Sequence, residues 1–115
     1  MNPLLISIQD AATGPVLGIF GDLDYTTVGE LHEQLTALTL HPGQSLVLDL
    51  AGLTFCDSSG ITALLVARNH AQAFHAGIAL AGVPDHILRV LRMVGLDQVF
   101  PFHPDRDAAT RISGS

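Results

Sequence analysis

The chain contains no lysine and a single cysteine. Its five basic residues, all arginine, are outnumbered by eleven aspartates and glutamates, which leaves a formal charge of −6. Such a chain repels a nucleic-acid backbone, so we expect no direct binding of DNA or RNA. The lone cysteine, Cys56, excludes an internal disulfide and fits a reducing compartment. We expect Cys56 to be a small buried hydrophobe rather than a reactive thiol, because Leu53 and Phe55 lie beside it.

Long apolar runs are also absent. Asp, Gly, His or Pro interrupts each run before the roughly 18 to 20 residues that a membrane-spanning helix needs. Residues 1–10 lack the basic region and the small-residue cleavage site of a secretory signal. With 115 residues, 48% of them hydrophobic, the chain has enough apolar material for one core. We therefore expect one soluble domain in the cytoplasm, without a membrane partner.

The pattern of apolar residues predicts an α/β domain. Short apolar segments bounded by turn formers indicate strands, and segments with apolar residues three and four apart indicate helices. Strand and helix alternate in the second half of the chain, which favours parallel strands joined by right-handed crossovers. We therefore expect a mixed, mostly parallel sheet with four helices packed on it. The predicted strands are residues 4–9, 16–20, 45–50, 77–82 and 98–102, with the first two as a hairpin and 45–50 in the centre.

Each of the four helices has a predicted start, and three have a predicted end. The starts are Thr26 or Thr27, Ser58, Pro84 with Asp85, and Pro104 with Asp105. The first helix should end at His41-Pro42-Gly43, the third at Gly95, and the fourth near Ile112, before a flexible tail at 113–115. The predicted apolar faces are Val28, Leu31, Leu35 and Leu38 in the first helix, Ile61, Leu64, Leu65 and Ala71 or Gln72 in the second, and Ile87, Val90, Leu91 and Val94 in the third.

One stretch, TFCDSSGITALL from Thr54 to Leu65, places an acid and two hydroxyls between two apolar runs. Asp57 or Ser58 can cap the helix that follows, by accepting hydrogen bonds from amides that have no partner in its first turn. Capping explains why one of the three polar residues is present, but it does not explain the other two. A serine nucleophile is disfavoured, because the glycines of a nucleophile elbow are misplaced and no histidine is marked as its partner.

Metal and nucleotide sites are not indicated either. The histidines at 32, 41, 70, 75, 86 and 103 lack the paired spacing of a zinc site, and His70 and His75 lie five apart, on different sides of a helix. No strand-to-helix joint carries the glycine-rich loop of a nucleotide cradle. The sequence therefore predicts no metal, no cofactor and no catalytic residue.

Residues 46–50 followed by residues 53–61 resemble the STAS domain of bacterial anti-sigma factor antagonists, also called anti-anti-sigma factors. In that family a core strand, a short loop ending in Asp-Ser-Ser/Thr-Gly, and a helix follow in this order. Residues 21–24 are similar to the family's Gly-Glu-Leu-Asp turn, and residues 91–96 to its third helix and exit. The resemblance implies a single STAS domain over residues 1–115, with a core at about 3–112.

This resemblance implies a partner switch and not an enzyme. In the family, an unphosphorylated antagonist binds an anti-sigma factor that is also a serine kinase, which frees the sigma factor for transcription. The kinase phosphorylates the first serine of the motif, here Ser58, the modified antagonist releases its partner, and a phosphatase restores it. STAS folds also occur in stress-signalling assemblies, in lipid-transport machinery and on anion transporters. A scaffold or accessory subunit of such a complex is therefore the alternative.

The resemblance also implies where a partner binds. Gly60 would keep the loop uncrowded there, and Asp57 would either cap the helix or orient the Ser58 hydroxyl. Asp22 stands where the family has Glu, and Ile61-Thr62 replaces a frequent Leu-Gly, which we expect to affect partner choice. The expected partner-contacting residues are Asp22, Asp24, Asp57, Ser58, Ser59, Gly60 and Thr62.

Overall fold

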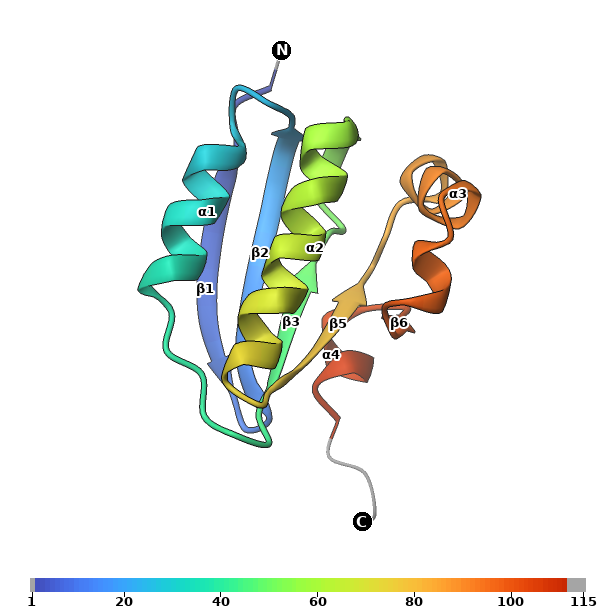
Figure 1. The fold of residues 1–115 in the computed structure, drawn as a ribbon. Coiled ribbons are helices and arrows are strands. Elements are labelled where there is room, and N and C mark those ends of the chain that lie inside the picture. The colour runs from blue at the N-terminus through green and yellow to red at the C-terminus, as the bar shows by residue number, and fades with distance from the viewer. Residues whose placement is uncertain (1, 112–115) are drawn as a thin grey trace.

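The computed structural model describes residues 2–111, which form one sheet with helices on both of its faces (Figure 1). The elements in chain order are β1 (Leu5–Ala11), β2 (Gly14–Leu23), α1 (Val28–Ala37), β3 (Ser45–Asp49), β4 (Leu53–Cys56), α2 (Ser58–Ala73), β5 (Gly77–Ala81), α3 (Asp85–Met93), the 3-10 helix η1 (Leu96–Gln98), β6 (Phe102–His103) and α4 (Arg106–Ala109).

The sheet has the order β1-β2-β3-β5-β6, with β4 paired to β2 outside this path. β1 and β2 form an antiparallel hairpin, whereas β2 with β3, β3 with β5, β5 with β6 and β2 with β4 are parallel. The predicted mixed, mostly parallel sheet and the central place of residues 45–50 are therefore confirmed.

On the edge opposite β1, strand β2 pairs with two different strands along its length. Its residues 16–18 pair with β3, whereas residues 21–23 pair with β4 after a change of register between Gly21 and Asp22. The end of β2 therefore lies beside the residues that immediately precede α2. Because β2 pairs with β4 at this end, two connections lie side by side at one end of the sheet. They are the loop from β2 to α1 and the short connection from β4 to α2.

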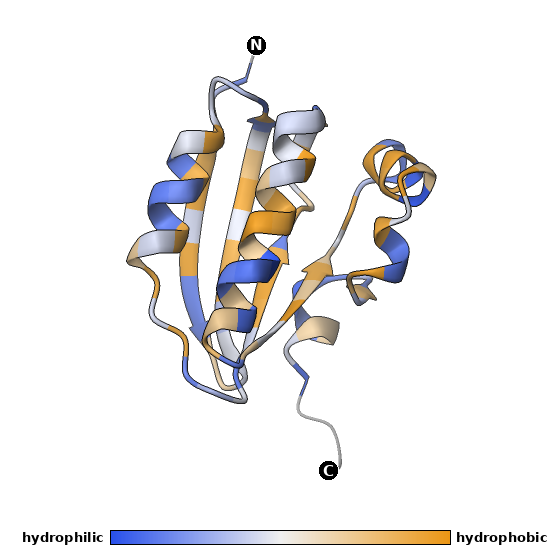
Figure 2. Ribbon diagram, in the orientation of Figure 1, coloured by the Kyte–Doolittle hydropathy of each residue, from blue (hydrophilic) through white to orange (hydrophobic). Residues whose placement is uncertain are grey.

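The main core lies between the sheet and the helices α1 and α2, which pack side by side on one face (Figure 1). Alternate residues of β2 and β3 point into it, and the helices contribute residues spaced three and four apart. Figure 2 shows the corresponding apolar strips on the strands. The buried residues include Leu17, Ile19, Leu46, Leu48, Leu31, Leu35, Leu64, Ala67 and Ala71.

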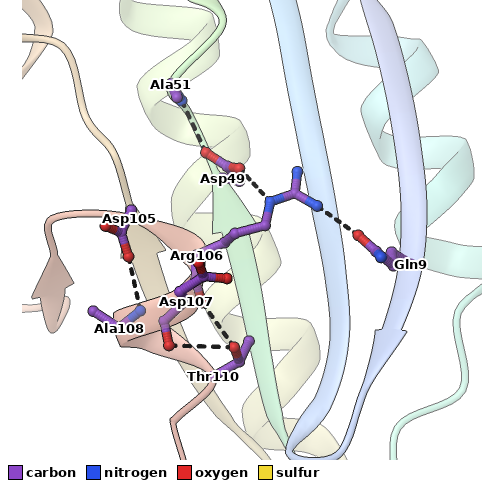
Figure 3. A network of polar contacts seen from close by, with 8 residues as sticks. All are labelled: Gln9, Asp49, Ala51, Asp105, Arg106, Asp107, Ala108 and Thr110. Atoms are coloured by element: carbon purple, nitrogen blue, oxygen red, sulfur yellow. Dashed lines mark hydrogen bonds and ion pairs between the residues drawn. The ribbon is translucent and has the colours of Figure 1, made fainter.

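The opposite face of the sheet carries a smaller cluster of Val16, Val47 and Ala81, against which Ala109 of α4 packs. Figure 3 shows α4 on this face, with the Arg106 side chain lying across the strands. Arg106 Nε is 2.7 Å from Asp49 Oδ2, and Arg106 Nη1 donates to Gln9 Oε1 at 2.7 Å. One guanidinium group therefore ties the short helix α4 to β3 and β1.

Two predictions about strands were wrong. Residues 53–56 form β4 where a loop was expected, because these four residues pair only with the distant end of β2 and show no local strand pattern. Residues 98–102 are mostly not a strand. Gly95, the predicted end of the third helix, has a left-handed conformation with a φ of 81°, but η1 follows it, and β6 is only two residues long. Pro101 and Pro104 bracket β6, and proline cannot donate to a ladder.

The predicted apolar face of the third helix was wrong in half of its members. Ile87 and Leu91 are buried, whereas Val90 and Val94 are 40% and 55% exposed. α3 stands beyond the β5–β6 edge of the sheet rather than across its face (Figure 1), so the core reaches it from one narrow side only. Val90 of α3 and Val94, which follows the helix, are consequently left at the surface.

The ends of two other helices differ from the predictions. α1 ends at Ala37, because Leu38 has an extended backbone while its side chain still packs against the core. Thr27 occupies the N-cap position of α1 but makes no capping hydrogen bond; its hydroxyl instead donates to the backbone carbonyl of Asp22 at 2.9 Å. α4 ends at Ala109, and the predicted end near Ile112, like the predicted tail 113–115, lies outside the described residues.

Replacing Arg106 by methionine should lower the free energy of unfolding by about 1–2 kcal/mol, since Asp49, whose side chain is only 12% exposed, would keep its charge without a partner. The figure is below that of a fully buried pair because the Arg106 side chain is 31% exposed. Adding Asp49→Asn should recover part of the loss in urea unfolding. Equal losses in the single and double variants would show that the unpaired charge of Asp49 is not the cause of the loss.

Candidate functional site

Asp57 joins the start of α2 to the neighbouring loop. Its Oδ1 accepts a hydrogen bond from the Gly60 amide at 2.9 Å, which caps the helix, and its Oδ2 accepts one from the Tyr25 amide at 3.3 Å. The Asp57 amide in turn donates to the Leu23 carbonyl at 3.2 Å. Of the two roles left open by the sequence, Asp57 has the capping role, and the Ser58 hydroxyl is not held by it.

Ser58 is the first residue of α2, and it is exposed. Within residues 2–111 its hydroxyl makes no hydrogen bond to another protein group, while its carbonyl accepts from the Thr62 hydroxyl at 3.0 Å. Ser58 thus presents a free hydroxyl at the positive end of a helix of sixteen residues, a place that favours negative charge. Chemically, this position can accept an anionic group without removing an existing interaction.

Gly60 is buried, and the structure gives this residue a packing role. A Cβ on Gly60 would lie 2.5 Å from the Leu23 carbonyl oxygen and 2.7 Å from Cys56 Sγ. The absence of a side chain therefore lets the first turn of α2 approach the end of β2. This close approach also fixes the positions of the neighbouring residues Ser58 and Ser59.

The carboxylates of Asp22 and Asp24 hold the loops around the motif. Asp22 Oδ1 accepts a hydrogen bond from the Thr54 hydroxyl at 2.6 Å, and this bond, with one from the Asn2 amide, lowers the pKa of Asp22. Asp24 Oδ1 accepts from the hydroxyl and amide of Thr26 at 2.6 and 2.9 Å, which lowers the pKa of Asp24. Both therefore remain ionised near neutral pH. The Asp24 carboxylate shapes the loop from β2 to α1, whereas the Asp22 carboxylate ties the end of β2 to β4 and to Asn2.

The predicted site residues do gather at one end of the sheet. The Asp57 contacts with Leu23 and Tyr25 bring the motif beside Asp22, near the end of β2, and Asp24, in the loop that follows. Thr62 is exposed one helical turn beyond Ser58. In the described part of the chain, no group of three or more His, Cys, Asp or Glu side chains could hold a metal ion.

The thiol of Cys56 is half-buried beneath this site and packs against the core. Burial, with a smaller effect of the Asp57 charge, raises the pKa of Cys56 to about 11. The thiol is therefore neutral at physiological pH, which supports the interpretation of Cys56 as a hydrophobe and not a nucleophile.

Sequence reasoning missed the apolar residues that surround the motif. Tyr25 is 76% exposed and Phe55 is 49% exposed. Between β4, α2 and α3 lies an apolar pocket of about 170 Å³. An aromatic residue inside a polar turn was the available signal for Tyr25, whereas nothing local marked the pocket. Its lining residues are Phe55, Cys56, Ile61, His86, Ile87, Val90 and Leu91.

Comparison with known sequences identifies the family. A family profile described as "Mlab, STAS domain" matches residues 6–101, which is more than half of the chain. The chain belongs to the STAS-domain family. A STAS-domain-containing protein of Pseudomonas aeruginosa is 28% identical to it over 82 residues, which cover 71% of this chain and 80% of that protein.

Solved structures share the STAS fold. An anti-sigma factor antagonist from Mycobacterium paratuberculosis has a TM-score of 0.80 at 24% identity, covering 93% of this chain and 92% of that one. The Bacillus antagonist SpoIIAA has TM-scores of 0.72 unphosphorylated and 0.67 phosphorylated, at 17% and 18% identity, covering 91% of this chain and 93% and 96% of those chains. At such identities the likeness shows the fold alone.

A transporter-related protein shares the STAS fold as well. The sulfate transporter family protein from Wolinella succinogenes has a TM-score of 0.72 at 18% identity, covering 83% of this chain and 80% of that one. Among residues 2–111 of the present chain, no helix is both long and apolar enough to span a membrane.

Changing Gly60 to alanine should lower the free energy of unfolding by about 2 kcal/mol, because the added methyl overlaps the Leu23 carbonyl and the Cys56 sulfur. The matched control is Gly29→Ala in α1, where a Cβ meets nothing within 4 Å. Gly29→Ala should raise stability by about 0.5 kcal/mol through helix propensity. Chemical unfolding of both variants tests this, and equal effects would contradict the close approach at Gly60.

Replacing Asp57 by alanine should lower the free energy of unfolding by about 1 kcal/mol, since the Gly60 and Tyr25 amides lose their acceptor. Asp57→Asn retains an oxygen that can accept the Gly60 hydrogen bond and should lose clearly less stability. Thermal unfolding of the two variants distinguishes the loss of the capping hydrogen bond from the loss of negative charge at this position. An asparagine variant as unstable as the alanine variant would contradict the capping role.

Proposed function

We propose that this STAS domain is an anti-sigma factor antagonist controlled by phosphorylation of Ser58. The observation that carries the proposal is the free, exposed Ser58 hydroxyl at the start of α2, within an Asp-Ser-Ser-Gly motif. In the unphosphorylated form the domain binds an anti-sigma factor that is a serine kinase, and so frees the sigma factor. Phosphorylation ends that binding, and a serine phosphatase restores it.

The chemistry of Ser58 fits a reversible modification. A phosphoryl group adds roughly −1.5 to −2 charge and three strong acceptor oxygens. The start of α2 favours this charge, and no existing hydrogen bond of the described residues is lost, so the fold should persist. At a binding surface, however, the dianion is costly to desolvate and is repelled by partner carboxylates. Phosphorylation of Ser58 should therefore act on binding and hardly on stability.

The neighbourhood of Ser58 supports a substrate of other enzymes rather than an enzyme. A serine nucleophile needs a base within hydrogen-bond reach, and within the described residues the Ser58 hydroxyl bonds to none. The proposal accordingly assigns the chemistry to a kinase and a phosphatase, and it requires no cofactor on this chain.

A scaffold or accessory subunit of a signalling or transport complex is the second candidate. The shared fold of the Wolinella sulfate transporter family protein favours it, because a STAS domain can evidently belong to a transporter family. In that case the same surface would bind its complex whether or not Ser58 is phosphorylated. Labelling of Ser58 and its effect on binding therefore separate the two candidates.

With ATP and the cognate serine-kinase anti-sigma factor, the wild-type chain should acquire a phosphoryl group on Ser58, mapped by mass spectrometry. Ser58→Ala should abolish the label, whereas the matched control Ser59→Ala should keep it. Ser58→Asp should weaken the complex by about tenfold or more, because it brings a charge to the interface, while its melting temperature stays near that of wild type.

Failure to label any serine with every cognate kinase would overturn the switch and leave the accessory-subunit candidate. A Ser58→Asp variant that unfolds well below wild type would show instead that Ser58 serves mainly the structure of the helix start.

A further inference from the structure

A cavity with both apolar and charged walls lies on a different side of α3 from the pocket lined by Ile61. Its walls come from α3, from η1 and from the segment around β6, and its volume is about 540 Å³. Val83 in its wall follows β5, and His103 ends β6, so the cavity reaches the carboxyl ends of two parallel strands. Both the volume and this position are typical of small-molecule sites in α/β domains.

The deeper part of the cavity is apolar. Phe100 is only 3% exposed and forms its base, while the half-buried side chains of Val83 and Phe102 stand above it. Pro101 and Pro104, which also line the cavity, fix the backbone on both sides of β6. These walls offer an apolar body of a ligand a preformed surface to pack against, which avoids the cost of ordering it on binding.

Three polar side chains in the wall of the cavity are free to meet a ligand. Within residues 2–111, the Arg92 guanidinium and the His103 imidazole make no hydrogen bond or salt bridge to a protein group. The Asp97 carboxylate accepts only one long hydrogen bond, from Gln98 Nε2 at 3.5 Å. Arg92 and Asp97 are exposed and therefore stand at the mouth, whereas His103 is half-buried. The mouth thus carries two groups that can donate hydrogen bonds and one that accepts them.

We propose that this cavity binds a small monocarboxylic acid with an apolar body. The guanidinium of Arg92 is permanently charged and can hold a carboxylate through two parallel hydrogen bonds, with the His103 imidazole as a further donor. The apolar body then packs against Phe100 and Phe102. Asp97 in the same wall repels a second negative charge, so a monoanion is preferred over a dianion such as a phosphate ester.

This site is separate from the Ser58 motif. None of the residues that line the cavity belongs to residues 54–65 or to the loop that contains Asp24. The carboxylic acid is therefore a second ligand of the domain, additional to the partner proposed for Ser58. Binding of the acid and phosphorylation of Ser58 are measured separately, and the failure of either proposal leaves the other standing.

Phenylacetate and octanoate are the probes, titrated into the protein and followed by NMR. At least one should bind with a dissociation constant on the order of 1 mM or tighter, and the amide signals of Phe100, Phe102 and His103 should shift. Phenethyl alcohol, which has the ring of phenylacetate without its charge, should bind about tenfold more weakly, and so should the dianion benzyl phosphate. Asp97→Asn should reduce the difference between phenylacetate and benzyl phosphate, because it removes the repelling charge.

Arg92→Gln should weaken the binding of the carboxylate by about tenfold, since it removes the charged donor. The matched control is Arg89→Gln, the same exposed substitution on the same helix at a residue that does not line the cavity, and it should bind as wild type does. Unfolding curves should show that both variants are folded. The proposal is overturned if neither acid binds at about 10 mM, if phenethyl alcohol binds as tightly as phenylacetate, or if Arg92→Gln and Arg89→Gln bind alike.

Discussion

The close approach of α2 to the end of β2 is the constraint on which the functional end of this domain depends. Gly60 allows it, since any side chain there would meet the Leu23 carbonyl and the Cys56 sulfur. Asp57 then fixes it, with one oxygen on the helix and the other on the loop that leads to α1. The orientation of Ser58 and the pocket at Ile61 follow from this junction. A small shift of the first turn of α2 would alter both together.

The composition gives the net charge of this domain, whereas hydrogen bonding determines what each charged side chain does. Asp22, Asp24 and Asp57 accept hydrogen bonds from hydroxyls or amides of neighbouring loops, so their negative charge stabilises turns. Asp49 is paired with Arg106 on the far face of the sheet. The arginines of α3, by contrast, are left in solvent. An acidic chain can thus carry exposed arginines on α3, which net charge alone would not predict.

The sequence predicts those helices and strands that can be recognised from the pattern of neighbouring residues. The branched apolar run 45–50 and the three-and-four spacing of Val28, Leu31 and Leu35 identify a central strand and a helix, and both are present. β4 escapes prediction because its partner, the end of β2, is distant in the chain. Within the site, the helix start and the serine motif are visible in the sequence. The burial of Gly60 and the exposure of Val90 are not, because each depends on which distant element packs against the residue.

The neutral thiol of Cys56 has a practical consequence. A thiol whose pKa is about 11 has very little thiolate at pH 7, and the thiolate is the form that reacts with alkylating reagents. An additional cysteine placed on an exposed turn would keep an ordinary pKa and would react far sooner. Fluorescent or spin labels can therefore be attached at a chosen surface position while the native cysteine stays in place beneath the motif. The protein is suited to spectroscopic study of its complexes without altering the junction that shapes them.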